Sequence, residues 1–176
     1  MQVDSEGQSD VREGLKMDTV VEVFIRRWDE KKKKYGKWYL HDRVKNIRTN
    51  AGVSFFAQQC YQTSGLGTNG TNYLALSSDA TAPAATDTII ASEINNTNGM
   101  GRAQGTVSVG TASSGSVVVT ISHTWTASGT VNNIQKGGLF DTATINTGNL
   151  GHEFTFTSTS VNSPDQLTLQ VSVTVS

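Results

Sequence analysis

Apolar and polar residues alternate most regularly near the end of the chain, over residues 165–176 (DQLTLQVSVTVS). An alternation with a period of two is typical of a β-strand that buries one face and exposes the other. Residues 116–126 (SVVVTISHTWT) follow the same pattern. We therefore predict two strands, whose inward side chains are Leu167, Leu169, Val171, Val173 and Val175 in one and Val117, Val119, Ile121, His123 and Trp125 in the other.

Two further alternating segments, residues 19–28 and 37–47, are close in the sequence and predict a β-hairpin. The connecting residues 29–36 (DEKKKKYG) place four consecutive lysines at its tip. Like charges repel, so these lysines must be solvated or paired with acids. The apolar faces of the hairpin are expected to hold Val21, Val23 and Ile25 in the first strand and Trp38, Leu40 and Val44 in the second.

The apolar period changes within residues 49–62 (TNAGVSFFAQQCYQ), and this change predicts a short helix over about 50–62. Gly65 can end this helix in a left-handed turn. We expect Cys60 to be a buried structural thiol, since it belongs to the apolar stripe of the helix. That stripe consists of Val53, Phe56, Ala57, Cys60 and Tyr61.

The remaining segments are typical of short strands and turns. Residues 79–94 are predicted to form a loop that runs into a helical turn from Asp87. Residues 131–141 are predicted to be turn-rich, with Leu139 and Phe140 as an apolar anchor. Further strands are expected at residues 71–77, 101–110 and 152–158.

Six to eight short strands with one or two helices predict a mainly β fold, a β-sandwich or jelly-roll-like domain. We divide the chain into an extended N-terminal arm over residues 1–18, a charged β-hairpin over residues 19–48 and a β-sandwich domain over residues 49–176. The arm is polar and lacks a convincing period. Nothing in its own sequence predicts a packed element.

Charge is distributed very unevenly. Of 14 Lys and Arg residues, 12 precede residue 49, and so do nine of 15 Asp and Glu residues. Residues 49–176 contain only eight charges in 128 positions and are rich in Thr, Ser, Gly, Asn and Val. Such a charge-poor surface suits a protein that packs into an assembly.

Global properties exclude several classes of partner. The net charge of −1 does not predict binding to nucleic acid or to a membrane surface. No apolar run approaches the roughly 18 residues of a membrane-spanning helix. The polar N-terminus does not predict a secretory signal, and the single cysteine fits a reducing compartment.

The sequence GLGTNG at residues 65–70 matches the G-x-G-x-x-G spacing of dinucleotide-binding loops. That motif requires a preceding strand and a helix that begins within it. Here the predicted helix precedes the motif and the predicted strand follows it. We therefore interpret GLGTNG as a connector whose glycines reverse the chain, and we expect no cofactor.

No pattern of residues predicts catalysis or metal binding. His41 is expected to face solvent, His123 to lie in the core and His152 to begin a strand. The sequence contains no G-x-S-x-G motif, and the residues HEF at 152–154 lack the spacing of a zinc-binding helix. We therefore expect a protein that is not an enzyme and holds neither a metal nor a cofactor.

The lysine-rich tip is the most conspicuous candidate for an interaction. It is either a solvated hairpin end or a contact to an acidic neighbour or to phosphate. The candidate interaction residues here are Arg26, Arg27, Lys31, Lys32, Lys33, Lys34 and Tyr35.

Three segments carry a resemblance to a known group of proteins: TNAG at 49–52 followed by VSFFAQQ, YLALSSDATAPAATDTIIASEI at 73–94, and IQKGGLFDTA at 134–143 followed by HEFTFTS and LTLQVSVTV. They resemble a pattern of tailed-bacteriophage virion proteins whose second element is of the type YLALGTGTTAPAATDTALANE. Lys136 departs from that pattern, which usually has an acid at this position. Lys136 is therefore a further candidate interaction residue, through a local ion pair or a subunit contact.

The resemblance implies a β-rich virion component without enzymatic activity, of the capsid-decoration, head-fibre, neck or tail accessory type. We expect a capsid decoration (cement) protein that stabilises the phage head through contacts with the major capsid protein or other virion subunits. The arm and hairpin are expected to supply these contacts, in a homo-oligomer, with a trimer favoured. Its expected location is the virion, assembled in the host cytoplasm.

Three alternatives remain open. The protein could be a neck, tail or fibre accessory that binds the host, with Trp125 or Tyr73 contacting sugars. A small hydrolase would need a pair of acids or a Ser–His arrangement that the sequence does not indicate. A nucleic-acid binder would rest on the four lysines alone and is not expected.

Overall fold

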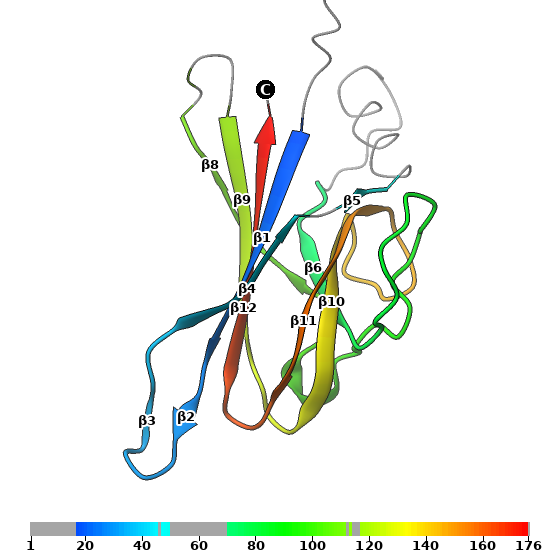
Figure 1. Ribbon diagram of the computed structural model, residues 1–176. Helices are drawn as coiled ribbons and strands as arrows, with labels where there is room; N and C mark the ends of the chain where they lie inside the picture. The colour runs from blue at the N-terminus through cyan, green and yellow to red at the C-terminus, as the bar shows by residue number, and fades with distance from the viewer. Residues whose placement is uncertain (1–16, 46, 50–69, 112, 114–116, 176) are drawn as a thin grey trace, which may run out of the picture.

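The computed structural model describes residues 17–45, 47–49, 70–111, 113 and 117–175, which form two antiparallel sheets packed face to face (Figure 1). The predicted β-sandwich is therefore confirmed. The first sheet contains, in spatial order, β4 (Tyr39–Lys45), β1 (Met17–Arg26), β12 (Gln166–Val175), β9 (Val117–Thr126) and β8 (Thr106–Val109). The second contains β5 (Ile47–Arg48), β11 (Leu150–Val161), β10 (Val131–Phe140), β6 (Tyr73–Ser77) and β7 (Ala103–Gln104).

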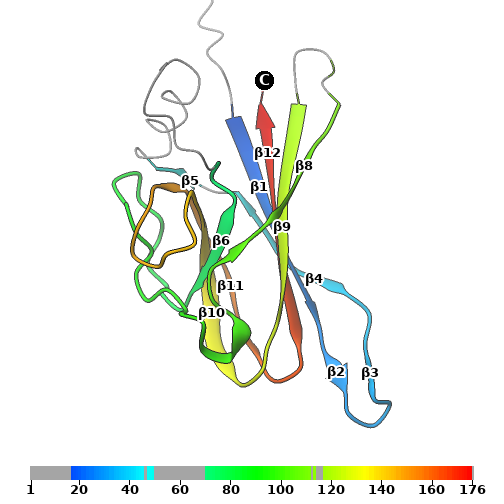
Figure 2. The same ribbon diagram turned by 180° about the vertical axis from the view of Figure 1, so that it is seen from behind.

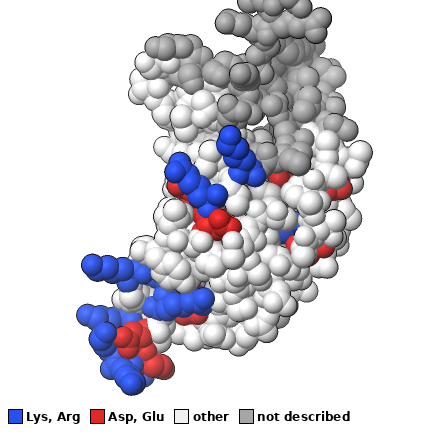
Figure 3. Space-filling view, in the orientation of Figure 1, with Lys and Arg blue, Asp and Glu red and all other residues white. Residues whose placement is uncertain are grey.

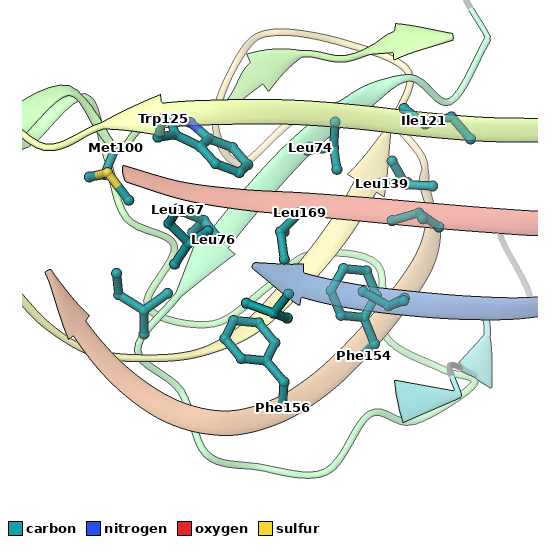
Figure 4. Packing of buried hydrophobic residues seen from close by; sticks show 14 of the residues in the cluster. Leu74, Leu76, Met100, Ile121, Trp125, Leu139, Phe154, Phe156, Leu167 and Leu169 are labelled. Carbon is teal, nitrogen blue, oxygen red and sulfur yellow. The ribbon is translucent and has the colours of Figure 1, made fainter. Parts of the chain in front are cut away.

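Side chains from both sheets form one apolar core between the layers (Figure 4). Trp125 lies in this core, where its indole Nε1–H donates to the carbonyl of Gly101 at 2.7 Å and so remains hydrogen-bonded although buried. The alternation predicted for the strand at 165–176 holds along β12, and that of the first hairpin strand holds along β1. The fully buried side chains of these two strands are Val21, Val23, Ile25, Leu167, Leu169 and Val171.

Strands β1 and β4 form the predicted hairpin, but the alternation of β4 is interrupted by a bulge. The register between the two strands shifts between Val23 and Phe24. Val44, beyond the shift, packs against the core, whereas Trp38 and Leu40 are exposed. The prediction that Trp38, Leu40 and Val44 lie on one face is therefore wrong, because a bulge moves the alternation by one residue.

Residues 131–141, predicted to be turn-rich, instead form the ten-residue strand β10 up to Phe140, so that prediction is wrong. The strand contains two adjacent glycines because its neighbours approach closely. A Cβ on Gly137 would lie 2.7 Å from the ring of Phe154, and one on Gly138 would lie 2.8 Å from Ile90. Glycine therefore marks close packing within a strand here, and not a turn.

The outer face of the second sheet is covered by the loop that follows β6, so both faces of this sheet are packed. Ile90 of this loop is buried with Phe140 and Leu150 of the sheet in a second, smaller apolar cluster. The predicted helical turn from Asp87 is wrong. Instead, the backbone N–H of Asp87 donates to the carbonyl of Ala84 at 3.0 Å and closes a tight turn. A 3-10 helix, Thr97–Gly99, follows later in the loop.

Several predictions concern residues outside the described ranges. These are the helix over about 50–62 with Cys60, the GLGTNG motif up to residue 69, and residues 1–16 of the arm. The last two residues of the predicted arm, 17 and 18, belong to β1. A helix capable of crossing a membrane does not occur in the part of the chain that the structure describes.

Candidate functional site

Among the described residues, the greatest concentration of exposed charge lies on the hairpin that continues β1 and β4 beyond the sandwich. Residues 28–40, which we call the projection, include the short strands β2 (Trp28–Asp29) and β3 (Lys34–Tyr35). Both views show this segment standing clear of the two sheets (Figure 1, Figure 2). Residues 26–37 carry seven basic and two acidic side chains, and Figure 3 shows this charge gathered at the end of the molecule.

The base of the projection is fixed to the turn between β11 and β12. Arg27 Nη1 donates to Asp165 Oδ2 at 2.6 Å, and the backbone N–H of Trp28 donates to Asp165 Oδ1 at 3.2 Å. Tyr35 donates its hydroxyl hydrogen to the carbonyl of Pro164 at 2.8 Å. Burial alone would raise the pKa of Asp165, but the hydrogen bonds it accepts and the charge of Arg27 hold that pKa below its usual value. The charged carboxylate thus anchors the projection.

Aromatic and cationic side chains pack along the projection. The rings of Trp28 and Tyr35 meet edge to face, with centroids 5.0 Å apart. The guanidinium of Arg26 lies 4.2 Å from the ring centroid of Tyr35 and 4.9 Å from that of Trp38. Arg26 Nε also donates to Gln166 Oε1 of β12 at 2.7 Å. These contacts hold the projection in one orientation relative to the first sheet.

The lysines at the tip are exposed and only partly paired. Lys32 lies 3.1 Å from Asp29, and Lys33 lies 2.9 Å from Glu30. Such exposed pairs contribute little stability, so they leave the tip available to a partner. Two lysines form no ion pair with any described residue, namely Lys31 and Lys34.

Seven of the eight predicted interaction residues therefore meet at the projection or its base. Lys136 does not join them, because it lies on the second sheet with a side chain only 2% exposed. The candidate interaction residues did not include Trp38, Tyr39 and Leu40, which are all exposed and add aromatic and apolar surface beside the lysines. The alternation of the hairpin strand had placed Trp38 and Leu40 inside, and the sequence gives no signal for the bulge.

Lys136 is surrounded by carboxyl groups, and we call Lys136, Asp79, Asp87 and Glu153 the Lys136 cluster. Lys136 Nζ lies 2.6 Å from Asp79 Oδ2 and 3.0 Å from Glu153 Oε1. Burial raises the pKa of Glu153 to about 7; contact with Asp87 also raises it, while Lys136 opposes the shift. Each of these charged residues is isolated in a charge-poor region of the sequence, and that isolation is the signal that could have indicated the cluster.

Two of the three histidines are hydrogen-bonded to backbone carbonyl groups. His41 Nε2 is hydrogen-bonded to the carbonyl of Thr157 at 2.8 Å, and His123 Nδ1 to that of Gln104 at 3.1 Å. Burial lowers the pKa of His123. Within the described ranges, no three His, Cys, Asp or Glu side chains are placed to hold a metal ion.

An apolar pocket of about 430 Å³ opens between the sheets at the end opposite the projection. Val119, Leu139 and Val175 are among the side chains that line it. Gly70 also borders it, and the chain immediately before Gly70 lies outside the described ranges. With few polar groups at its wall, the pocket has little with which to orient a polar substrate.

The chain matches no protein-family model, no curated protein and no solved structure. Two of the segments that carry the resemblance are direct neighbours, since β6 pairs with β10 from Tyr73 opposite Phe140 to Ser77 opposite Lys136. These segments, far apart in the sequence, thus build one structural unit.

Proposed function

We propose that this protein is a non-enzymatic structural component of a tailed-phage virion, and specifically a capsid decoration protein. In this proposal the projection docks onto the major capsid protein or another virion subunit. The observation that carries it is a fixed, net-positive hairpin standing clear of the sandwich, with exposed aromatic residues beside its lysines. The motif resemblance supplies the class of assembly.

The composition of the projection suits protein recognition. Trp, Tyr and Arg contribute a large share of the binding energy at protein interfaces, and all three are present here. The anchored base reduces the entropy lost on docking, because the hairpin is already held in one orientation relative to the first sheet. An interface of standard size buries roughly 800 Å² on each partner. The excess of lysine predicts that the docking surface of the partner is acidic.

Symmetric repetition extends this contact over the particle. A homo-oligomer, for which we favour a trimer, presents several projections at once and multiplies the effective affinity. Stabilisation of the head follows from burial of surface between neighbouring subunits and needs no chemical step.

The test is docking onto particles purified without this protein, followed by co-sedimentation. In the variant Lys31→Gln/Lys34→Gln, we expect the affinity to fall roughly tenfold, because two unpaired charges that face an acidic partner are removed. The matched control is Arg43→Gln/Lys45→Gln, which makes the same change in net charge on exposed positions of β4. Wild-type docking by the tip variant, or equal loss in both variants, would contradict a docking role for the projection.

Copy number distinguishes decoration from the neck, tail or fibre alternative. Quantitative mass spectrometry of purified particles should find hundreds of copies for a decoration protein, whereas a small multiple of three or six would place the protein at the neck or tail. The second result would retain the virion class and overturn the decoration assignment.

A further inference from the structure

Three carboxyl groups surround Lys136 on the covered face of the second sheet. Lys136 lies on β10, Glu153 on the neighbouring β11, and Asp79 and Asp87 on the loop after β6. The side chains of Lys136 and Glu153 are 2% and 1% exposed, and that of Asp79 is 18% exposed. An amine and a carboxyl group are thus held in contact where water has little access.

Glu153 is placed to exchange protons with this pair. Its Oε1 lies 3.0 Å from Lys136 Nζ, whereas its buried Oε2 accepts no hydrogen bond in the described part of the chain. When Glu153 is protonated, its second oxygen is no longer buried without a hydrogen bond, because the O–H can donate to the adjacent Asp87 carboxylate. Since its pKa is raised to about 7, Glu153 can both hold and release a proton near neutral pH.

The two oxygens of Asp79 have different surroundings. Oδ1 accepts hydrogen bonds from the backbone N–H of Thr81 at 3.2 Å and from its hydroxyl at 2.9 Å. Oδ2 accepts from Lys136 Nζ at 2.6 Å. Two donors on Oδ1 can stabilise a negative charge there, as an oxyanion hole does. Oδ2 lies beside a proton donor and is therefore suited to leave.

We propose that Lys136 and Asp79 join within the folded chain by an amide (isopeptide) bond between Nζ and Cγ, with Glu153 as the catalytic proton carrier. Asp79 is the carboxyl partner because it combines contact with Nζ and a doubly hydrogen-bonded Oδ1. Glu153 touches the same nitrogen but lacks donors on its second oxygen.

The ion pair is the starting state, since hydrogen bonds to Asp79 and Glu153 raise the pKa of Lys136 although burial alone would lower it. The reaction begins when Lys136 passes one proton to Asp79 Oδ2, leaving a neutral amine and a neutral carboxyl group. Nζ then attacks Cγ, and the charge that develops on Oδ1 is stabilised by Thr81. The neutral amine and carboxyl group are only a minor population, so the reaction is slow. Each chain undergoes the reaction once.

Glu153 completes the reaction. Its ionised Oε1 takes the second proton from Nζ and returns it to Oδ2, which leaves as water. One C–N bond forms and one C–O bond breaks, so an ammonium and a carboxylate become an amide and one water molecule. Glu153 ends unchanged, and no oxidant or other co-reactant is needed. The product links the loop after β6 covalently to β10.

Trypsin provides a direct test on the full chain. Residues 49–176 contain only two trypsin sites, Arg102 and Lys136. We expect no cleavage after Lys136 in folded protein that is then denatured and digested. Fragments 49–102 and 103–176 should remain joined, with a combined mass lower by one water, and tandem mass spectrometry should locate the link at Asp79. Separate fragments 49–102, 103–136 and 137–176 after prolonged incubation at neutral pH, or a link at another acid, would overturn the proposal.

Variants test the assigned roles. Asp79→Ala should abolish the link, whereas Glu153→Gln keeps both reactants and should slow its formation strongly. Thr81→Val, at an exposed position where folding is not at risk, should slow formation by up to about 100-fold because one donor to Oδ1 is lost. The control Asp141→Asn should link at the wild-type rate. Wild-type rates in both Glu153→Gln and Thr81→Val would contradict the mechanism.

Discussion

Arg102 is one of only two basic residues after residue 48, and the fold uses its charge internally. Its guanidinium forms a two-pronged pair with Glu93 at 2.8 and 2.7 Å, and both side chains are at most 2% exposed. It also lies 3.6 Å from the ring centroid of Phe140. Its Nη1 donates to the carbonyls of Thr142, Thr144 and Thr147. Arg102 thereby connects three segments of the chain.

Replacement of Arg102 by methionine should destabilise the protein strongly. Arg102→Met leaves the Glu93 carboxylate buried without its partner, so we expect the free energy of unfolding to fall by about 3–5 kcal/mol. Urea denaturation followed by circular dichroism measures this change. Arg43→Met is the matched control, since Arg43 forms an exposed pair with Glu22 at 3.4 Å and should cost less than about 1 kcal/mol. Equal losses in the two variants would show that burial of the Arg102 pair is unimportant.

Glu153 should give the stability an unusual dependence on pH. Its pKa rises from about 4.5 in the unfolded chain to about 7 in the fold, so the folded protein binds more protons between these values. The free energy of unfolding should therefore decrease as pH rises from about 4.5 to 7, by at most about 3 kcal/mol. Urea denaturation at several pH values measures the slope, and Glu153→Gln should lack this contribution. An identical slope in the variant would contradict the raised pKa.

At the scale of elements, regular alternation is what made strands predictable. β1, β9 and β12 bury one face in a single core, so their apolar residues recur at every second position. β10 is packed on both faces and interrupted by shifts of register, so its sequence lacks that period. The same sequence features that indicated a turn, glycine and asparagine, accommodate these irregularities.

Replacement of Gly137 by alanine should expose the packing constraint on β10. The added Cβ would meet the ring of Phe154 at 2.7 Å and the carbonyl of Ala75 at 3.1 Å. We expect a loss of about 1–3 kcal/mol in the free energy of unfolding, because the neighbouring atoms cannot move aside without strain. Gly70→Ala is the control, since none of the described residues has an atom within 4 Å of its Cβ position. Unchanged thermal stability of Gly137→Ala would disprove the close approach.

The candidate site was only partly predictable for a related reason. The lysines of the projection could be predicted because they are consecutive in the sequence and because an exposed tip needs no partner elsewhere in the chain. The Lys136 cluster was not, since Asp79 and Lys136 are 57 residues apart and meet only when β6 pairs with β10. A contact of that kind depends on strand order and register, which local patterns do not specify.

At the scale of the whole molecule, some charged side chains form contacts within the fold and others are exposed to a partner. Every charged side chain after residue 48 is hydrogen-bonded within the fold, so the sandwich presents a largely neutral surface of Ser, Thr and Asn. Most of the charge available to a partner gathers instead at the projection, with a smaller group on β4 of the first sheet (Figure 3). Under the docking proposal, this division orients the incoming molecule, since only one end is strongly attracted to an acidic surface.

The pairing of Met17 with Val175 gives this molecule a practical use. The first and last described residues adjoin at one end of β1, and the projection begins at the other, a distance of about 30 Å for a strand of this length. If the projection docks onto the head as proposed above, that far end points outward. A peptide epitope fused genetically after the last strand would then be displayed on the outside of the head, clear of the docking contact.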